Sequence, residues 1–309
     1  MESGLVGKRA FVFPGQGSQY VGMAKDIYEN SSSAKELVQK AEDTIKFNIS
    51  KIMFDGPVEE LKQTDTTQPA LFLHSALLLN EIKNHQPDVV AGHSLGELTA
   101  LYSAEALDFN DAVKLIRKRG EAMLFAGEKE QGTMAAIIGM DGETIETICS
   151  QASEDGVVQC ANFNSPGQIV ISGSSVGVKK AMSLAKENSA RLVKELVVSG
   201  AFHSPLMKTA EEIFRDTLEK VNINNAKIPV YANVTAGAVT NKNEIKDLLI
   251  KQLTSPVKWQ QTIENMIDDG VTEFVEIGAG KVLQGLIKRI NPNVKIIGID
   301  KYIDLQKLV

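Results

Sequence analysis

The sequence predicts an α/β protein, in which a larger domain built on a parallel sheet carries an inserted ferredoxin-like subdomain. Short apolar runs alternate with segments of helical spacing along most of the 309 residues, a pattern typical of a parallel sheet. Between residues 127 and 200 the order changes to β-α-β-β-α-β, which is the order of a ferredoxin-like unit. No Pro/Ser-rich linker separates the two patterns, so we expect two domains with a close boundary.

The first part of the chain contains two short predicted strands, and each is followed by a glycine-rich turn. Residues 9–13 precede the turn PGQG at 14–17, and residues 89–91 precede the turn GHSLG at 92–96. Helical spacing covers residues 23–28, 34–43, 70–84, 97–106 and 111–123. We expect Pro69 in the first turn of the third of these helices, where its missing N–H has no cost.

The remaining elements define the proposed domain boundaries. In the inserted unit we expect strands at 133–138, 157–163, 168–172 and 191–197, with helices at 142–152 and 174–187. After it come helices at 205–221, 244–253 and 259–269, strands at 230–233, 273–277 and 295–299, and a helix between the last two strands. We therefore assign residues 1–126 and 201–309 to the large domain and 127–200 to the subdomain.

Composition excludes several classes of protein. The chain has 33 Lys and Arg against 39 Asp and Glu, a net charge of −6, whereas a nucleic-acid binder carries a basic excess. No apolar run approaches the ~18 residues of a membrane span, and the first residues lack the pattern of a signal peptide. Cys149 and Cys160 cannot form a disulfide framework, which fits a reducing compartment. We expect a cytoplasmic protein that binds neither nucleic acid nor membrane, and a monomer because no extra apolar stripe is evident.

The turn GHSLG at residues 92–96 fits the pattern G-x-S-x-G of a nucleophile elbow. Such an elbow lifts a serine, here Ser94, clear of the backbone between a strand and a helix. The amide of Leu95 would then face the oxyanion that forms when the serine attacks a carbonyl. The alternative is an ordinary glycine-rich turn, but the apolar strand before the motif and the helix after it favour the elbow. The backbone N–H of Gln16, after the other strand, is a candidate second donor, although a plain turn explains that loop equally well.

A serine needs a general base, and the sequence offers four histidines. His74 lies in an apolar helix, His85 ends that helix, and His93 is too close to Ser94 in the chain, so a structural role explains each. His203 follows the inserted unit, where a loop can line a cleft, and it is the best candidate by elimination. An Asp, a Glu or a carbonyl group could orient this histidine, and the sequence does not choose among them.

Arg119 lies in the basic run RKRG at residues 117–120. A solvated basic helix face is one explanation of this run. The other is an arginine turned inward, because a planar guanidinium binds a carboxylate through two hydrogen bonds. Histidine and cysteine residues are too few and scattered for a metal site, and the turns at 15–17 and 278–280 lack the spacing of a dinucleotide site.

Seven segments together resemble the malonyl-CoA:acyl carrier protein transacylases of bacterial fatty-acid synthesis. They are FVFPGQGSQYVGM at 11–23, GHSLGE at 92–97, RKRGEAM at 117–123, NFNSPGQIVISG at 162–173, GAFHSPLM at 200–207, QLTSPVKW at 252–259 and EIGAGKVLQGLIKRI at 276–290. The resemblance implies a hydrolase-like α/β domain with a ferredoxin-like insertion. It also implies a nucleophilic Ser94, with His203 as its base and Arg119 as the partner of the malonyl carboxylate.

The same resemblance implies four supporting roles. The backbone amides of Gln16 and Leu95 would form the oxyanion hole, and the main-chain carbonyl of Gln252 would orient the histidine. Phe202 matches the ring that disfavours a branched acyl group. The implied partners are malonyl-CoA and acyl carrier protein, and the CoA thioester is a substrate, so no cofactor is expected.

Several alternatives remain open from the sequence. A stand-alone acyltransferase of a polyketide synthase would use the same residues, and a serine thioesterase or esterase would use the same elbow. A non-catalytic docking module would need none of these side chains. Because acyl carrier proteins are typically acidic and the chain has a net negative charge, we expect a local basic surface for docking. The candidates are Lys114, Arg117 and Lys118, Lys179 and Lys180, and Lys288 and Arg289.

Overall fold

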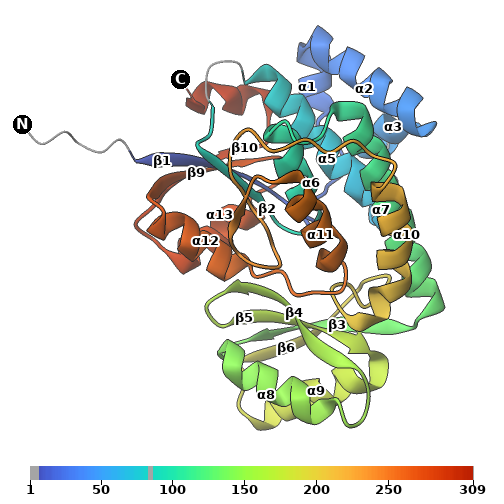
Figure 1. Ribbon diagram of the computed structural model, residues 1–309, viewed down its shortest axis with the longest axis vertical. Helices are drawn as coiled ribbons and strands as arrows, with labels where there is room; N and C mark the ends of the chain where they lie inside the picture. The colour runs from blue at the N-terminus through green and yellow to red at the C-terminus, as the bar shows by residue number, and fades with distance from the viewer. Residues whose placement is uncertain (1–6, 83–85, 309) are drawn as a thin grey trace, which may run out of the picture.

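The computed structural model describes residues 7–82 and 86–308 and contains two β-sheets (Figure 1). The first sheet has six strands in the order β10-β9-β1-β2-β7-β8. The strands are β1 (Lys8–Phe13), β2 (Val89–Gly92), β7 (Val230–Tyr231), β8 (Ala238–Val239), β9 (Val271–Ile277) and β10 (Lys295–Ile299). All neighbouring pairs are parallel except β7 and β8, which are antiparallel. The α/β class predicted from the sequence is confirmed.

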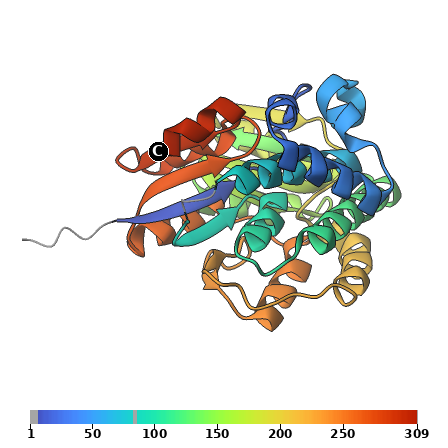
Figure 2. The ribbon, with the colours of Figure 1, turned by 90° about the horizontal axis from the view of Figure 1, so that it is seen from above.

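Helices cover both faces of this sheet (Figure 2). They are α1 (Lys25–Asn30), α2 (Ser32–Ile45), α3 (Ile49–Asp55), α4 (Val58–Leu61), α5 (Thr64–Glu81), α6 (Leu95–Ser103), α7 (Phe109–Lys129), α10 (Lys208–Leu218), α11 (Lys242–Gln252), α12 (Trp259–Asp268) and α13 (Val282–Ile290). Alternate residues of β1 enter different cores. Phe11 and Phe13 pack with the α2, α5, α6 and α7 side, and Ala10 and Val12 pack with α12 and α13. Burial on both faces explains why the strand has no polar alternation.

The prediction for Pro69 was wrong, because α5 begins at Thr64 and places this proline inside the helix. A proline there cannot donate to the carbonyl four residues earlier, which is that of Asp65. Arg117 of α7 compensates by donating from Nη1 to the Asp65 carbonyl at 2.7 Å, and its Nη2 pairs with the Asp65 carboxylate at 3.1 Å. A side chain distant in sequence thus satisfies the helix. The predicted end of this helix, with His85, lies outside the described residues.

Two other predictions in the last third of the chain differ from the structure, and one strand was missed. The helix expected over 205–221 is a short 3₁₀ turn, Pro205–Met207, followed by α10. The strand expected over 230–233 is only Val230–Tyr231, and β8 was not predicted. A strand of two residues is too short to produce a recognisable apolar pattern, so its pairing depends on the neighbouring strand.

The second sheet is antiparallel and has the strand order of a ferredoxin-like unit. Its order is β4-β5-β3-β6, and two helices cover one face. The elements are β3 (Gly132–Ile138), α8 (Gly142–Ala152), β4 (Val158–Ser165), β5 (Gln168–Ser174), α9 (Ser175–Glu187) and β6 (Leu192–Leu196). Figure 1 shows this unit below the larger sheet. The chain enters and leaves it at one place, where Gly127 packs so tightly that a Cβ there would lie 2.1 Å from the carbonyl oxygen of Ser199.

Close backbone packing fixes the turn between β2 and α6. A Cβ on Gly96 would lie 2.1 Å from the carbonyl oxygen of Phe13, at the end of β1. A Cβ on Gly92 would lie 1.9 Å from the carbonyl carbon of Gly96. The glycines of the motif therefore allow β1, β2 and the start of α6 to meet, which no other residue type permits.

In the parts of the chain described, no helix is long and apolar enough to cross a membrane.

Gly96→Ala is expected to lower the free energy of unfolding by about 1–3 kcal/mol, because the new methyl group must displace the β1 backbone. The matched control is Gly285→Ala in α13, where an added Cβ meets no atom within 4 Å. That variant is expected to gain about 0.4–1 kcal/mol from the reduced entropy of the unfolded chain. Chemical denaturation of both variants tests the difference, and equal effects would contradict the packing argument.

Candidate active site

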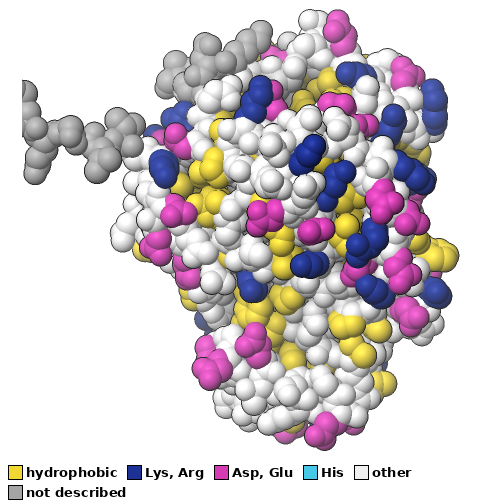
Figure 3. Space-filling view, in the orientation of Figure 1, with side chains coloured by type: hydrophobic (Ala, Val, Ile, Leu, Met, Phe, Trp, Pro, Cys, Tyr) yellow, Lys and Arg dark blue, Asp and Glu magenta, His cyan; other side chains and the backbone are white. Residues whose placement is uncertain are grey.

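A cavity of about 230 Å³ lies between the large sheet and the ferredoxin-like unit. The large domain contributes Ser94 and Arg119 to its lining, and the smaller unit contributes Met134, Val170 and Leu196. The residues at the carboxyl ends of β1 and β2 face this space, as expected for parallel strands. Figure 3 shows apolar side chains exposed between the larger and the smaller part of the molecule.

Ser94 stands on the sharp turn between β2 and α6. Its backbone has φ +52° and ψ −106°, an unusual conformation for a residue with a side chain, and one that raises the hydroxyl out of the turn. The Oγ lies 2.8 Å from Nε2 of His203. The first residue of α6 is Leu95, whose amide belongs to the first turn and has no acceptor within the helix.

His203 is buried, and its partners determine which nitrogen carries the proton. Nδ1 lies 2.8 Å from the main-chain carbonyl oxygen of Gln252, and since a carbonyl only accepts, Nδ1 must donate. Nε2 is then the unprotonated nitrogen that accepts from the hydroxyl of Ser94. Burial, and next the charge of Arg119, lower the pKa of His203 to about 3. The imidazole is therefore neutral at neutral pH and free to accept a proton.

Arg119 is turned inward from α7, with about 1% of its surface exposed. Its Nη1 donates to Oε1 of Gln68 at 2.7 Å, and its Nη2 donates to Oε1 of Gln252 at 2.8 Å and to Oγ of Ser94 at 3.1 Å. Its Nε has no partner among the described residues. Burial lowers the pKa of the guanidinium to about 10, so it remains charged at neutral pH. The basic run at residues 117–120 therefore includes an arginine that is turned inward, Arg119, and is not only a solvated helix face.

Gln16 and Phe202 also line the cavity. The loop that holds Gln16 packs directly on the elbow, since a Cβ on Gly15 would lie 2.5 Å from the carbonyl oxygen of His93. The structure thus brings all seven residues named from the sequence to one place: Ser94, Leu95 and Arg119, the main chain of Gln252, His203, Phe202 and Gln16.

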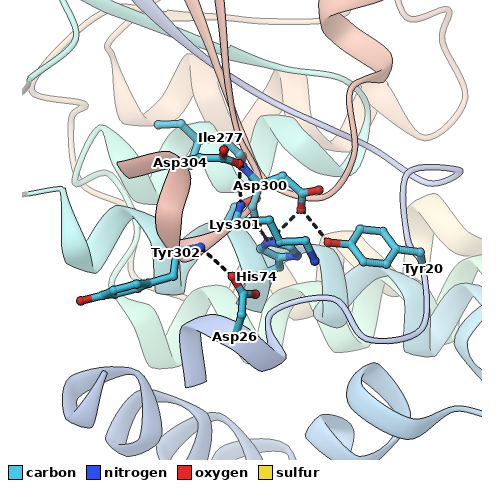
Figure 4. Close-up of polar contacts among 9 residues, drawn as sticks. Tyr20, Asp26, His74, Ile277, Asp300, Lys301, Tyr302 and Asp304 are labelled. Atoms are coloured by element: carbon cyan, nitrogen blue, oxygen red, sulfur yellow. Dashed lines mark hydrogen bonds and ion pairs between the residues drawn. The ribbon is translucent and has the colours of Figure 1, made fainter. Parts of the chain in front are cut away.

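The other described histidines have structural contacts. His93 Nε2 lies 2.9 Å from Oδ1 of Asn164, and its ring lies near that of Trp259, so it joins the elbow to the smaller unit. Nε2 of His74 lies 2.8 Å from the backbone oxygen of Asp300, and Figure 4 shows the two residues side by side. In the same cluster the hydroxyl of Tyr20, which follows the Gln16 loop, donates to Oδ1 of Asp300 at 2.8 Å. The cluster holds that loop to the C-terminal segment.

Two further residues of the site were missed by the sequence analysis. Asn233 is fully buried, accepts from the amide of Ser94 at 2.7 Å through Oδ1, and donates to the carbonyl of Gly92 at 2.7 Å through Nδ2. The carboxylate of Glu97 accepts from the amide of Asn233 and from Nε2 of Gln252, both at 2.8 Å. The sequence analysis placed Asn233 in a strand over 230–233, but the strand ends at Tyr231, so its role in a turn was missed.

Within the described ranges, no three His, Cys, Asp or Glu side chains could hold a metal ion together.

Comparison with known proteins assigns the family. Residues 10–296 match the family model described as the acyl transferase domain. A malonyl CoA-acyl carrier protein transacylase from Bacillus subtilis is 48% identical over 295 residues, which are 94% of this chain and 93% of that protein. The chain belongs to the acyl transferase family. In this member of the family, Ser94, the neutral His203 and the buried Arg119 line the same cavity.

Solved structures of acyl transferases have the same fold. An acyl carrier protein S-malonyltransferase from Vibrio cholerae superposes with a TM-score of 0.95 at 41% identity, covering 98% of this chain and 100% of that one. A malonyl-transacylase solved with a type II polyketide-synthase acyl-carrier protein has a TM-score of 0.94 at 35% identity, covering 97% and 98%. These matches agree with the hydrolase-like fold that the family resemblance implied.

Asn233→Ala is expected to lower the acylation rate of Ser94 by a thioester at least about tenfold, because the elbow loses the side chain that fixes it. It also leaves the amide of Ser94 and the carbonyl of Gly92 unpaired, so the free energy of unfolding should fall by about 2 kcal/mol or more. Asn265→Ala is the control, since its amide donates to the Ala236 carbonyl away from the serine. Mass spectrometry and denaturation provide the readouts, and normal acylation of the Asn233 variant would contradict this role.

Proposed function

We propose that the chain transfers a malonyl group from CoA to the pantetheine thiol of acyl carrier protein, through a malonyl ester on Ser94. The observation that carries this proposal is the guanidinium of Arg119, 3.1 Å from the serine oxygen. An acyl group attached to that oxygen has its far end beside a buried positive charge, which favours a terminal carboxylate. The names of the relatives described above support the same substrates.

In the first half of the reaction, His203 accepts the proton of Ser94 through Nε2 as the oxygen attacks the thioester carbonyl. In the proposed step the backbone amides of Leu95 and Gln16, two residues that line the cavity, donate to the resulting oxyanion. The carbonyl of Gln252 keeps the proton on Nδ1 of the histidine and so fixes the reactive tautomer. The thiolate of CoA leaves and takes the proton from Nε2.

In the second half, the thiol of the carrier protein occupies the position that CoA has left. His203 accepts the thiol proton, the sulfur attacks the ester carbonyl of the acylated serine, and Ser94 leaves with the proton restored. The reaction converts one thioester and one thiol into another thioester and another thiol, and the proton returns to Ser94, so the proposed reaction needs no cofactor. The carboxylate beside Arg119 also offsets the charge that lowers the pKa of His203, which makes this base stronger while an acyl group is bound.

The choice of acyl group follows from burial. An acetyl group would leave the buried guanidinium of Arg119 without an added partner, whereas a malonyl carboxylate supplies one. Phe202, with 6% of its surface exposed, lines the cavity and limits the room for a branched acyl group.

Among the basic groups considered for docking of the carrier, the pair on α13 has the best support. Arg289 donates to Oε1 of Gln168, which lines the cavity, so it stands at the cavity rim beside the exposed Lys288. In the α7 group, by contrast, Arg117 and Lys118 both pair with Glu121. Basic and acidic side chains are mixed over the face shown in Figure 3. That the chain is a cytoplasmic monomer stays a prediction.

The alternatives differ in the acceptor. A thioesterase would pass the acyl group to water, and a carboxylate on the histidine would favour it, but a main-chain carbonyl holds His203 here. A polyketide-synthase carrier would be served by the same chemistry and would differ only in the acceptor protein.

Incubation with malonyl-CoA is expected to add one malonyl group to the chain, and the addition should disappear in Ser94→Ala because the nucleophile is gone. Addition of phosphopantetheinylated carrier protein should then move the malonyl group to the carrier faster than free malonate forms. Intact-mass spectrometry measures both steps. Labelling that persists in Ser94→Ala, or malonate as the main product with carrier present, would overturn the proposal.

Arg119→Ala is expected to reduce malonyl transfer by a factor of about 100 or more, since the buried site loses its charge-assisted hydrogen bonds to the carboxylate. Acetyl transfer should change far less, so the ratio of the two kcat/KM values should shift toward acetyl. Arg289→Ala is a control at the rim, where the ratio should stay as in the unsubstituted chain. An unchanged ratio in Arg119→Ala would exclude the role of this arginine.

A further inference from the structure

We propose that Glu97 is the counter-charge of Arg119 and takes up a proton when a malonyl carboxylate enters the site. The inference rests on the proposed function and extends it, because it names the group that balances the charge of the substrate. Glu97 does not reach the cavity, so it acts as a positioning residue through its neighbours.

The contacts of Glu97 connect it to the reacting groups. About 3% of the residue is exposed, and its Oε2 accepts from Nε2 of Gln252 at 2.8 Å. The oxygen of the same side-chain amide, Oε1 of Gln252, accepts from Arg119 at 2.8 Å. The side-chain amide of Gln252 thus connects the carboxylate of Glu97 to the guanidinium of Arg119 through two hydrogen bonds. The main-chain oxygen of Gln252 also fixes His203, so one residue connects counter-charge, substrate arginine and base.

The balance of charge in this buried region depends on four titratable side chains. Arg119 from α7 is positive, and among the described residues it is the charged group that acts on the carboxyl of Glu97. His203, from the loop before the 3₁₀ turn, and His93, from the elbow, face the same region, and burial lowers the pKa of both, so both are neutral at neutral pH. With an ionised Glu97 the region is neutral overall.

A malonyl carboxylate adds a second negative charge to a region in which Arg119 and Glu97 are both buried. Like charges in low dielectric cannot both stay ionised at small cost, so one of them binds a proton. Arg119 contacts the incoming carboxylate directly, whereas Glu97 is one amide farther away and is already destabilised as an anion by burial. Burial raises the pKa of the Glu97 carboxyl to about 7, against the opposing effects of Asn233, Gln252 and Arg119. A further rise on binding moves the proton from solvent onto Glu97.

The sign of the pH dependence follows directly. Below the pKa of the free chain, Glu97 is already protonated, and the malonyl group binds with no proton taken up. Above it, each binding event must also bind a proton, so affinity for malonyl-CoA falls about tenfold per pH unit until the pKa of the complex is reached. Acetyl-CoA has no carboxylate, and its binding should not show this dependence.

The direct test counts protons. Malonyl-CoA is titrated into the Ser94→Ala protein in a calorimeter at pH 7.5 or above, in two buffers of different ionisation enthalpy, and acetyl-CoA provides the reference that removes the contribution of the CoA phosphates. We expect malonyl-CoA to take up a large part of one proton more than acetyl-CoA. Preferential binding of malonyl-CoA without extra uptake would overturn the role of Glu97 and leave the proposed function intact. Absence of any preference for malonyl-CoA would overturn both.

A matched pair of variants tests the residue itself. Glu97→Gln keeps an oxygen acceptor for Asn233 and Gln252 but cannot ionise, so the extra proton uptake should vanish and malonyl-CoA should bind more tightly at high pH. Glu276→Gln is the control, because Glu276 is also buried, burial also raises the pKa of its carboxyl to about 7, and its contacts are on α13. Uptake that persists in Glu97→Gln, or vanishes in Glu276→Gln as well, would contradict the assignment.

The pH profile of the active chain provides a second readout that a purely structural role would not change. In the unsubstituted protein, kcat/KM for malonyl-CoA should decline above pH 7 through KM while kcat changes little. The Glu97→Gln profile should be flat over the same range. Parallel profiles in the two proteins would refute the proposal even if calorimetry is prevented by weak binding.

Discussion

Arg119 carries a positive charge at a position where about 1% of its surface reaches solvent, and the rest of the site is arranged around that charge. Side-chain oxygens of Gln68, Gln252 and Ser94 accept its hydrogen bonds. Glu97 supplies the opposite charge and is connected to Arg119 through the side-chain amide of Gln252. Burial and the charge of Arg119 lower the pKa of His203, which keeps the imidazole neutral and leaves Nε2 able to accept the proton of Ser94. Since a buried guanidinium without partners would be costly, its hydrogen bonds stabilise Arg119 in its buried position.

Geometry comes from the backbone as much as from side chains. Glycines at 92 and 96 let the end of β1 approach the elbow, and Asn233, in the turn after β7, holds the amide of Ser94 and the carbonyl of Gly92. The strained φ of the serine persists because neighbouring elements fix it on both sides. The ferredoxin-like unit then closes the cavity with apolar side chains, which lowers the local dielectric and strengthens each of these electrostatic contacts.

The class of fold and the residues at the cavity could be predicted from the sequence because short-range patterns carry them. An apolar strand before GHSLG, and a run of helical spacing after it, describe the elbow without tertiary information. Pro69 shows where such patterns fail, since Arg117, distant in sequence, satisfies the carbonyl that the proline leaves unpaired. Asn233 and Glu97 could not be assigned from spacing because their roles depend on contacts between the turn after β7, α6 and α11. The carbonyl of Gln252 and the ring of Phe202 were named only through the family resemblance.

The most direct test of the account is a crystal structure of the chain acylated by malonyl-CoA at Ser94, trapped without carrier protein. We expect the carboxylate oxygens about 2.7–3.1 Å from the guanidinium of Arg119. The carbonyl oxygen of the ester should lie within the same distance of the amides of Gln16 and Leu95. A malonyl carboxylate directed into solvent, with Arg119 still bound only to Gln68 and Gln252, would contradict the account.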